Sequence, residues 1–108
     1  RGGREYVFSA SYGVGKAGVD RMAKDFAVEL VDHGVSAISL SPSKVKTEFI
    51  LEMVEAGKMK LDPDGAQSVR LSGRSVAALA CDPNILDHTG SILTVTEVQS
   101  IYGIIDPD

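Results

Sequence analysis

The clearest pattern in the chain is a run of apolar residues at helical spacing between about residues 13 and 33. These residues share one broad face of a helix, and charged residues on the opposite face form two pairs of opposite sign at four-residue spacing. Ser11 suits the N-cap position and Gly34 the position just after the last turn, so the pattern predicts a long amphipathic helix. The apolar positions are Val19, Met22, Ala23, Phe26, Ala27, Leu30 and Val31, and the charge pairs are Asp20 with Lys24 and Arg21 with Asp25.

Beyond residue 34 the pattern alternates between short apolar runs and further helical segments. This alternation of helix and strand indicates an α/β fold, and the apolar runs are typical of buried parallel strands. Two strands cannot form a stable buried sheet alone, so we expect further strands upstream of residue 1. The predicted elements are strands at 35–40 and 91–96, a short helix at 48–56 capped by Thr47, and a helix capped by Ser72 that runs to about Cys81. The tail from 97 to 108 has apolar residues without a clear period.

Composition narrows the class of protein. The chain has 108 residues, which is enough for one small domain. Its net charge of −4 argues against a nucleic-acid-binding protein, and no apolar run approaches the roughly 18 residues of a membrane span. The one cysteine, Cys81, excludes an internal disulfide, so we expect a reducing compartment such as the cytoplasm and leave organelle targeting open. The two histidines lack metal-ligand spacing, and no metal site is predicted.

The segment Tyr12-Gly13-Val14-Gly15-Lys16 carries the candidate chemistry. Positions four residues apart share one helix face, so the Tyr12 oxygen and the Lys16 nitrogen can reach the same small volume. A nearby cation lowers the pKa of a phenol, which makes proton exchange with a substrate oxygen feasible near neutral pH. Three glycines in these first turns, at 13, 15 and 18, also suggest that another group packs or binds close to the backbone.

Several segments together resemble the C-terminal half of a short-chain dehydrogenase/reductase. A Y-x-x-x-K pair alone is a weak signal, but it is followed here by a strand that ends in P-x-x-V-x-T, and the combination is specific. The resemblance implies that residues 1–108 are the C-terminal portion of a single NAD(P)-binding domain, part of a Rossmann-type doubly wound parallel sheet whose N-terminal half is missing. The matching segments are 11–20, 39–47, 76–83 and 90–95, and segments 12–16 and 82–86 are most similar to one subgroup of the family.

The resemblance also implies roles for individual residues. Tyr12 matches the acid/base that exchanges a proton with a carbonyl or alcohol substrate, and Lys16 matches the lysine that lowers the tyrosine pKa and binds the nicotinamide ribose. Pro42, Val45 and Thr47 match the loop at the nicotinamide of NAD or NADP. In the family the long helix pairs with its copy, so we expect a homo-oligomer through residues 13–33. Thr47 fits its role on independent grounds, because a helix N-terminus binds anions.

Two departures from the family pattern keep other interpretations open. Ser43 stands where the family usually has glycine, and a side chain there would crowd the nicotinamide or change the loop. The Gly-rich dinucleotide loop, the residue that selects NAD or NADP, and the catalytic serine would all lie before residue 1, so we expect the 108-residue chain alone to be inactive. The alternatives are a non-catalytic oligomerisation or binding module and a sugar-nucleotide epimerase, although an epimerase would carry a longer substrate domain after this point.

Overall fold

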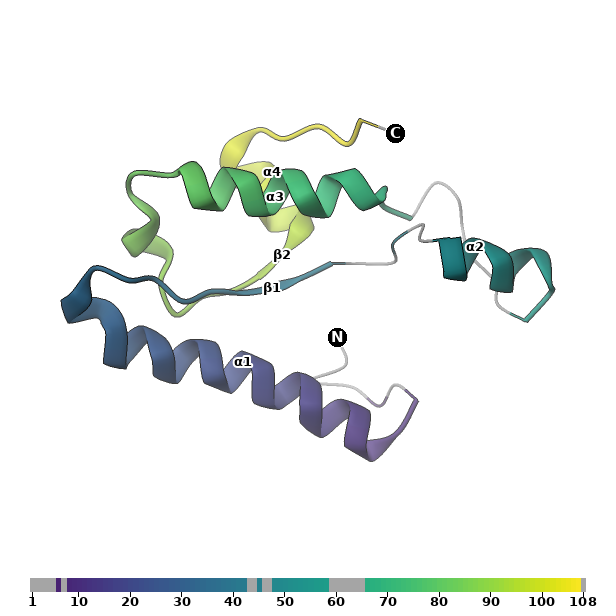
Figure 1. Cartoon of the computed structure of the whole chain (residues 1–108), viewed down its shortest axis with the longest axis horizontal. Coiled ribbons are helices and arrows are strands. Elements are labelled where there is room, and N and C mark those ends of the chain that lie inside the picture. Colours follow the sequence, from purple (N-terminus) through teal and green to yellow (C-terminus); the bar gives the residue numbers. More distant parts are fainter. Residues whose placement is uncertain (1–5, 7, 43–44, 46–47, 59–65, 108) are drawn as a thin grey trace. The chain divides into compact units, whose positions relative to one another are not determined.

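The computed structural model describes residues 6, 8–42, 45, 48–58 and 66–107 (Figure 1). They fall into two compact units, one of residues 1–40 with 83–93 and the other of residues 41–82 with 94–108. The elements, in chain order, are α1 (Ala10–Leu30), the 3₁₀ turn η1 (Val31–His33), β1 (Ser39–Ser41), α2 (Glu48–Glu55), α3 (Val69–Cys81), the 3₁₀ turn η2 (Ile85–His88), β2 (Ile92–Thr94) and α4 (Val95–Tyr102).

The two strands pair in parallel, which confirms the predicted α/β class. The Ser39 N–H donates to the Ser91 carbonyl (3.1 Å) and the Gly90 N–H to the Ala37 carbonyl (2.7 Å). Two parallel strands must be joined by a crossover connection. Here the chain between β1 and β2 contains α2 and α3. Both strands are shorter than the predicted 35–40 and 91–96, because three residues of each are paired in the described sheet. The doubly wound arrangement requires further strands and stays a prediction.

The long helix of the first unit begins and ends three residues earlier than the predicted 13–33, and the 3₁₀ turn η1 continues it to His33. Ser9, not Ser11, is the N-cap, because its hydroxyl accepts the Tyr12 N–H at 3.2 Å. Gly34 follows η1 with φ of 70°, a left-handed conformation that glycine adopts without a steric penalty. The predicted pair of Arg21 with Asp25 is confirmed at 3.1 Å.

The apolar face of α1 is largely open within the part of the chain that the structure describes. Two small residues, Ala23 and Ala27, are buried, and a Cβ added at Gly90 would lie 3.4 Å from that of Ala27. Gly90 also has φ of 81°, so a residue with a side chain at this position would be strained. Exposed fractions of 52% for Met22 and 44% for Phe26 show that the larger side chains of this face are still accessible.

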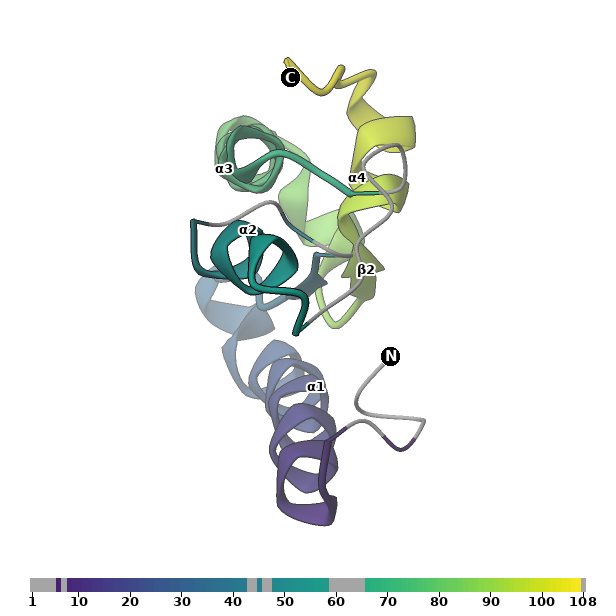
Figure 2. The same ribbon diagram turned by 90° about the vertical axis from the view of Figure 1, so that its right-hand side faces the viewer.

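In the second unit α3 packs beside α4 (Figures 1 and 2). Leu71, Val95 and Val98 are buried between them, with exposed fractions of 1% or less. Helix α4 begins at Val95, so the last two residues of the predicted strand 91–96 are helical, and the tail for which no element was predicted contains a helix. It begins where the Thr94 hydroxyl accepts the Glu97 N–H at 3.1 Å, and this cap ends the strand. Within the described residues no helix is both long and apolar enough to cross a membrane.

The N-cap of α3 is Ser68, which corrects the prediction of Ser72. The Ser68 hydroxyl accepts the Leu71 N–H at 3.2 Å and donates to Asp106 at 2.5 Å, while the Ser68 N–H donates to the same carboxylate at 3.0 Å. The Ser72 Oγ is buried and has no hydrogen-bond partner among the residues that the structure describes. The carboxylate of Asp106 therefore fixes both the start of α3 and the C-terminal tail.

We predict opposite effects of alanine at these two serines. Ser68→Ala removes the cap and the contact with Asp106, and should lower the free energy of unfolding by about 2 kcal/mol. Ser72→Ala removes an unpaired buried hydroxyl and should leave stability within about 0.5 kcal/mol or raise it. Urea denaturation of the matched variants measures both, and an equal loss in the two would contradict the assignment of the cap.

Tyr102 should make stability depend on pH in the alkaline range. Its hydroxyl donates to the Asp82 carboxylate at 2.6 Å. This hydrogen bond, with partial burial and the charge of Asp82, raises the pKa of Tyr102 to about 12. The protonated phenol is thus favoured in the folded state. Its contribution is fully present below the unfolded pKa of about 10, and is lost as the pH rises through about 12.

Tyr102→Phe should therefore lower the free energy of unfolding by about 1 kcal/mol at neutral pH. The difference from the unmodified chain should shrink above pH 10. Tyr6→Phe is the control, because the hydroxyl of Tyr6 donates to a carbonyl at an exposed site. Urea denaturation between pH 7 and 12 tests the prediction, and a difference that does not vary with pH would refute it.

Candidate active site

Tyr12 and Lys16 lie on neighbouring turns near the N-terminus of α1, as their spacing predicts. The Lys16 Nζ lies over the Tyr12 ring, 5.5 Å from its centroid. At an exposed site such a cation–π contact contributes about 0.5–1 kcal/mol. Tyr12 is 38% exposed, so its phenol is held beside a cation and stays accessible to a ligand. The positive end of the helix dipole adds to the lysine charge, and both favour an anion at this end of α1.

Phe8 also contacts the Tyr12 ring. The two rings meet edge to face, with centroids 5.3 Å apart and planes at 87°. Phe8 has φ of 63°, which is unusual for a bulky residue and costs about 1–3 kcal/mol. An edge-to-face contact contributes about 0.5–1.5 kcal/mol and offsets part of that strain. The ring of Tyr12 thus contacts both an aromatic ring and an ammonium group.

Two of the three glycines of this segment, Gly15 and Gly18, have no close neighbour among the residues that the structure describes. A Cβ added at Gly15 or at Gly18 would meet no atom within 4 Å. The backbone of the first turns is therefore open on these sides in the described structure. An open backbone beside Tyr12 and Lys16 leaves space for a ligand or for another part of the protein.

The other predicted site residues belong to the second unit. Pro42 is exposed and follows β1 directly. Val45 is half-buried, and its backbone forms a parallel bridge with Gln67, so part of its hydrogen-bonding capacity is used within the chain. Thr47, and Ser43 with it, lie outside the described residues. The structure therefore brings Tyr12 and Lys16 together and does not test the loop that was predicted to bind the cofactor.

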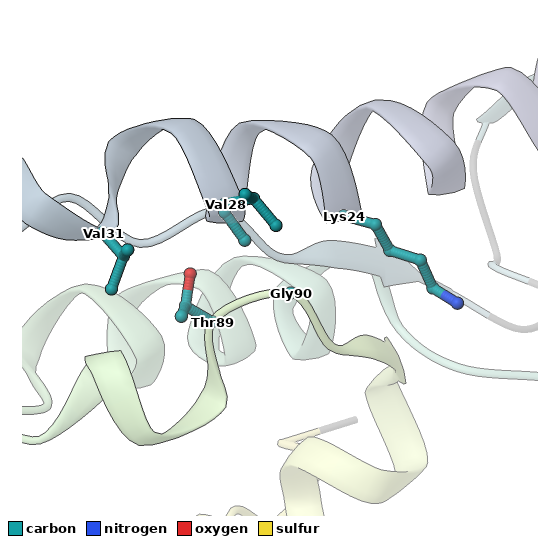
Figure 3. Close-up of a pocket in the computed structure, with 6 residues that line it drawn as sticks. Lys24, Val28, Val31, Thr89 and Gly90 are labelled. Carbon is teal, nitrogen blue, oxygen red and sulfur yellow. The ribbon is translucent and has the colours of Figure 1, made fainter.

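A shallow depression in the first unit lies apart from Tyr12 and Lys16 (Figure 3). Its volume is about 390 Å³, and Figure 3 shows Val28 of α1 and Val31 of η1 beside Thr89 and Gly90. Lys24 also lines it, twelve residues or about 18 Å along the helix axis from Tyr12. The depression therefore does not serve a reaction at the Tyr12 hydroxyl. No group of three or more metal-ligating side chains occurs in the described residues.

Asp20 is a residue whose place the sequence analysis missed. It was paired with Lys24 on the charged face, but its carboxylate accepts a hydrogen bond from the Ser39 hydroxyl at 2.6 Å. The sequence does contain a signal for this contact. Asp20 lies three residues before the buried Ala23, which places it on the edge of the helix face that packs against the strand.

The cap of α1 should control the order of the turn that carries Tyr12. Ser9→Ala removes the acceptor of the Tyr12 N–H and should speed the hydrogen exchange of that amide about fivefold, as expected for the loss of about 1 kcal/mol of capping energy. Ser11→Ala is the matched control, since the Ser11 hydroxyl contacts Ser9 but caps no amide of the helix. Equal acceleration in both variants would show that Ser9 is not the cap.

Almost the whole chain can be aligned with the sequences of known proteins. No protein-family model matches it. Dehydrogenase/reductase SDR family member 1 of Mus musculus is 43% identical over 116 residues, and the protein of that name from Homo sapiens is 40% identical over 116 residues. Each alignment covers 99% of this chain, which spans 37% of the length of either relative. These relatives confirm the subgroup that segments 12–16 and 82–86 resemble. Over nearly its whole length, the chain is therefore similar to part of a short-chain dehydrogenase/reductase, which supports its identification as a fragment of that family.

Proposed function

We propose that this chain supplies the proton-transfer half of an NAD(P)(H)-dependent oxidoreductase that interconverts a small carbonyl compound and its alcohol. The observation that carries the proposal is the placement of the Tyr12 phenol beside the Lys16 ammonium on an accessible helix end. The relatives are named as dehydrogenase/reductases, which supports the same reaction class. Because the chain spans 37% of their length, the activity proposed is that of the whole protein.

The chemistry follows from the two side chains. The Tyr12 hydroxyl donates its proton to the oxygen of a carbonyl substrate during reduction and takes a proton from the alcohol during oxidation. Lys16 and the helix dipole stabilise the negative charge that forms on the Tyr12 oxygen. The nicotinamide cofactor, when bound, supplies or accepts the hydride. The ammonium of Lys16 is a suitable donor to the ribose hydroxyls, and the open backbone at Gly15 and Gly18 leaves room for such a ligand.

The rest of the site is proposed from the family pattern. Pro42, Val45 and Thr47 would form the loop at the nicotinamide, with Val45 using the backbone groups that its bridge with Gln67 leaves available. The Gly-rich loop and the catalytic serine would come from preceding sequence. Residues 1–108 would then be part of one Rossmann-type domain with a doubly wound sheet, and would be inactive alone. A cytoplasmic location also stays a proposal.

The exposed apolar face of α1 supports a second candidate function. Val19, Met22 and Phe26 are 55%, 52% and 44% exposed in the described structure. Such side chains suit the contact of this helix with its copy in a homo-oligomer. A protein that uses this helix for association and has lost cofactor binding would be the non-catalytic module considered from the sequence. Cofactor binding by the whole protein discriminates between the two functions.

Calorimetry with NADH and NADPH is the first test. The whole protein should bind at least one cofactor, and the 108-residue chain should bind neither. If the whole protein is folded and binds neither cofactor, the oxidoreductase proposal fails and the association module is favoured.

Variants of the pair then test the mechanism in the whole protein. Tyr12→Phe should lower kcat with a carbonyl substrate by about 10²–10⁴-fold with little change in cofactor affinity, because it removes the proton donor. Lys16→Met should lower kcat and also weaken cofactor binding. Tyr6→Phe is the control, since Tyr6 is 83% exposed and lies outside the proposed site. Full activity of Tyr12→Phe would exclude Tyr12 as the acid/base.

A further inference from the structure

A hydrogen bond fastens α1 to β1 one helical turn beyond Lys16. The Ser39 Oγ donates to Asp20 Oδ1 at 2.6 Å, a length typical of a hydroxyl bound to a carboxylate. Ser39 is 6% exposed. Removing the acceptor would therefore leave a buried hydroxyl unsatisfied, where water has little access to replace it. The hydrogen bond itself is part-buried, because Asp20 is less buried than Ser39.

Asp20 also belongs to the same row of side chains as the catalytic pair. Tyr12, Lys16 and Asp20 follow each other at four-residue spacing, so each is rotated by only about 40° from the one before. Along the helix axis the carboxylate lies about 6 Å from Lys16 and about 12 Å from Tyr12. A tilt of α1 about this point displaces Tyr12 about twice as far as Lys16, because Tyr12 lies about twice as far along the axis.

The N-terminal half of α1 has few other attachments in the described structure. Its first buried residue is Ala23, which lies eleven residues after Tyr12. Among the described residues of this half, Asp20 is the one with a hydrogen bond to another element. The strand that it reaches is itself held, because the Ser39 N–H donates to the Ser91 carbonyl in the sheet.

We propose that Asp20 and Ser39 form a positioning link that holds the Tyr12–Lys16 face of α1 at a fixed rotation and height relative to β1. Its effect on catalysis rests on the proposed function, whereas the link itself is a contact that can be tested alone. Pro42 follows Ser39 by three residues, so the link joins the proton donor to the strand from which the predicted cofactor loop continues. Asp20 acts through the helix and touches no substrate.

A role through charge is the rival explanation. Asp20 stands four residues from Lys16, close enough for its carboxylate to interact with the ammonium. Asp20→Asn separates the two explanations, because asparagine keeps an oxygen that accepts the Ser39 hydroxyl and loses the charge. A positioning role predicts that asparagine restores function, and a charge role predicts that it does not.

The kinetic test uses the whole protein with a carbonyl substrate. Asp20→Ala and Ser39→Ala should each lower kcat about tenfold with less than about a threefold change in cofactor Kd, because Tyr12 is displaced more than Lys16. The double variant should be no worse than either single variant, since both remove one interaction. Asp20→Asn should recover most of the activity, and Asp25→Ala, which removes an exposed ion pair of the same helix, should have no effect.

Several outcomes would overturn the proposal. These are an unchanged kcat in the alanine variants, losses that multiply in the double variant, and an asparagine variant as impaired as the alanine variant.

Hydrogen exchange keeps this test separate from the proposed function. In the whole protein, the amides of residues 16–20 and of Ser39 should exchange faster in Asp20→Ala and in Ser39→Ala, to a similar extent, and near the unmodified rate in Asp20→Asn. If the unmodified protein shows no turnover and these exchange rates change as expected, the proposed function fails and the link stands. If the exchange rates do not change, the link is rejected whatever the activity.

Discussion

The pairing of β1 with β2 is the constraint on which the first unit depends. It brings residues 37–39 against 89–91 through two backbone hydrogen bonds, and the Thr89 hydroxyl adds a third by accepting the Ala37 N–H at 3.0 Å. This paired segment gives α1 its support, with Gly90 against Ala27 and Ser39 against Asp20. The position of a helix that carries a tyrosine and a lysine is thus set by contacts made far along the chain from both.

The contact between α1 and this segment is narrow, and that affects what the helix can present. The side chains buried along it are alanines, so the helix approaches closely but gains little apolar burial per residue. The hydrogen bond between Ser39 and Asp20 restricts the orientation of the helix, which the packing of alanines alone does not. The helix end beyond this bond, with Tyr12 and Lys16, remains accessible, as a site that receives a substrate and a cofactor requires. The described contacts that hold α1 against the paired segment therefore come from Asp20 onward, and Tyr12 and Lys16 lie before them.

The features that the sequence predicts correctly are local ones. The helix over 13–33 repeats its apolar pattern often enough to identify, Gly34 marks its end, and the proximity of Tyr12 to Lys16 follows from their spacing alone. The errors arise where two candidates compete. Ser68 and Ser72 both suit a cap, and Asp106, almost forty residues away, determines which one is used. Asp20 has a nearby Lys24 and a distant Ser39, and its observed hydrogen bond is with the distant residue. Helix α4 was missed because its eight residues contain too few repeats to show a period.

The two units have a further consequence for anyone who wishes to study them separately. Each unit is made of two stretches that are not adjacent in the chain, and the divisions fall inside both β1 and β2. A single truncation therefore cannot isolate either unit, because every cut that removes one of them also removes a stretch of the other. Separating the two units would require cutting the chain within β1 and β2 and joining the remaining stretches of each unit by new connections.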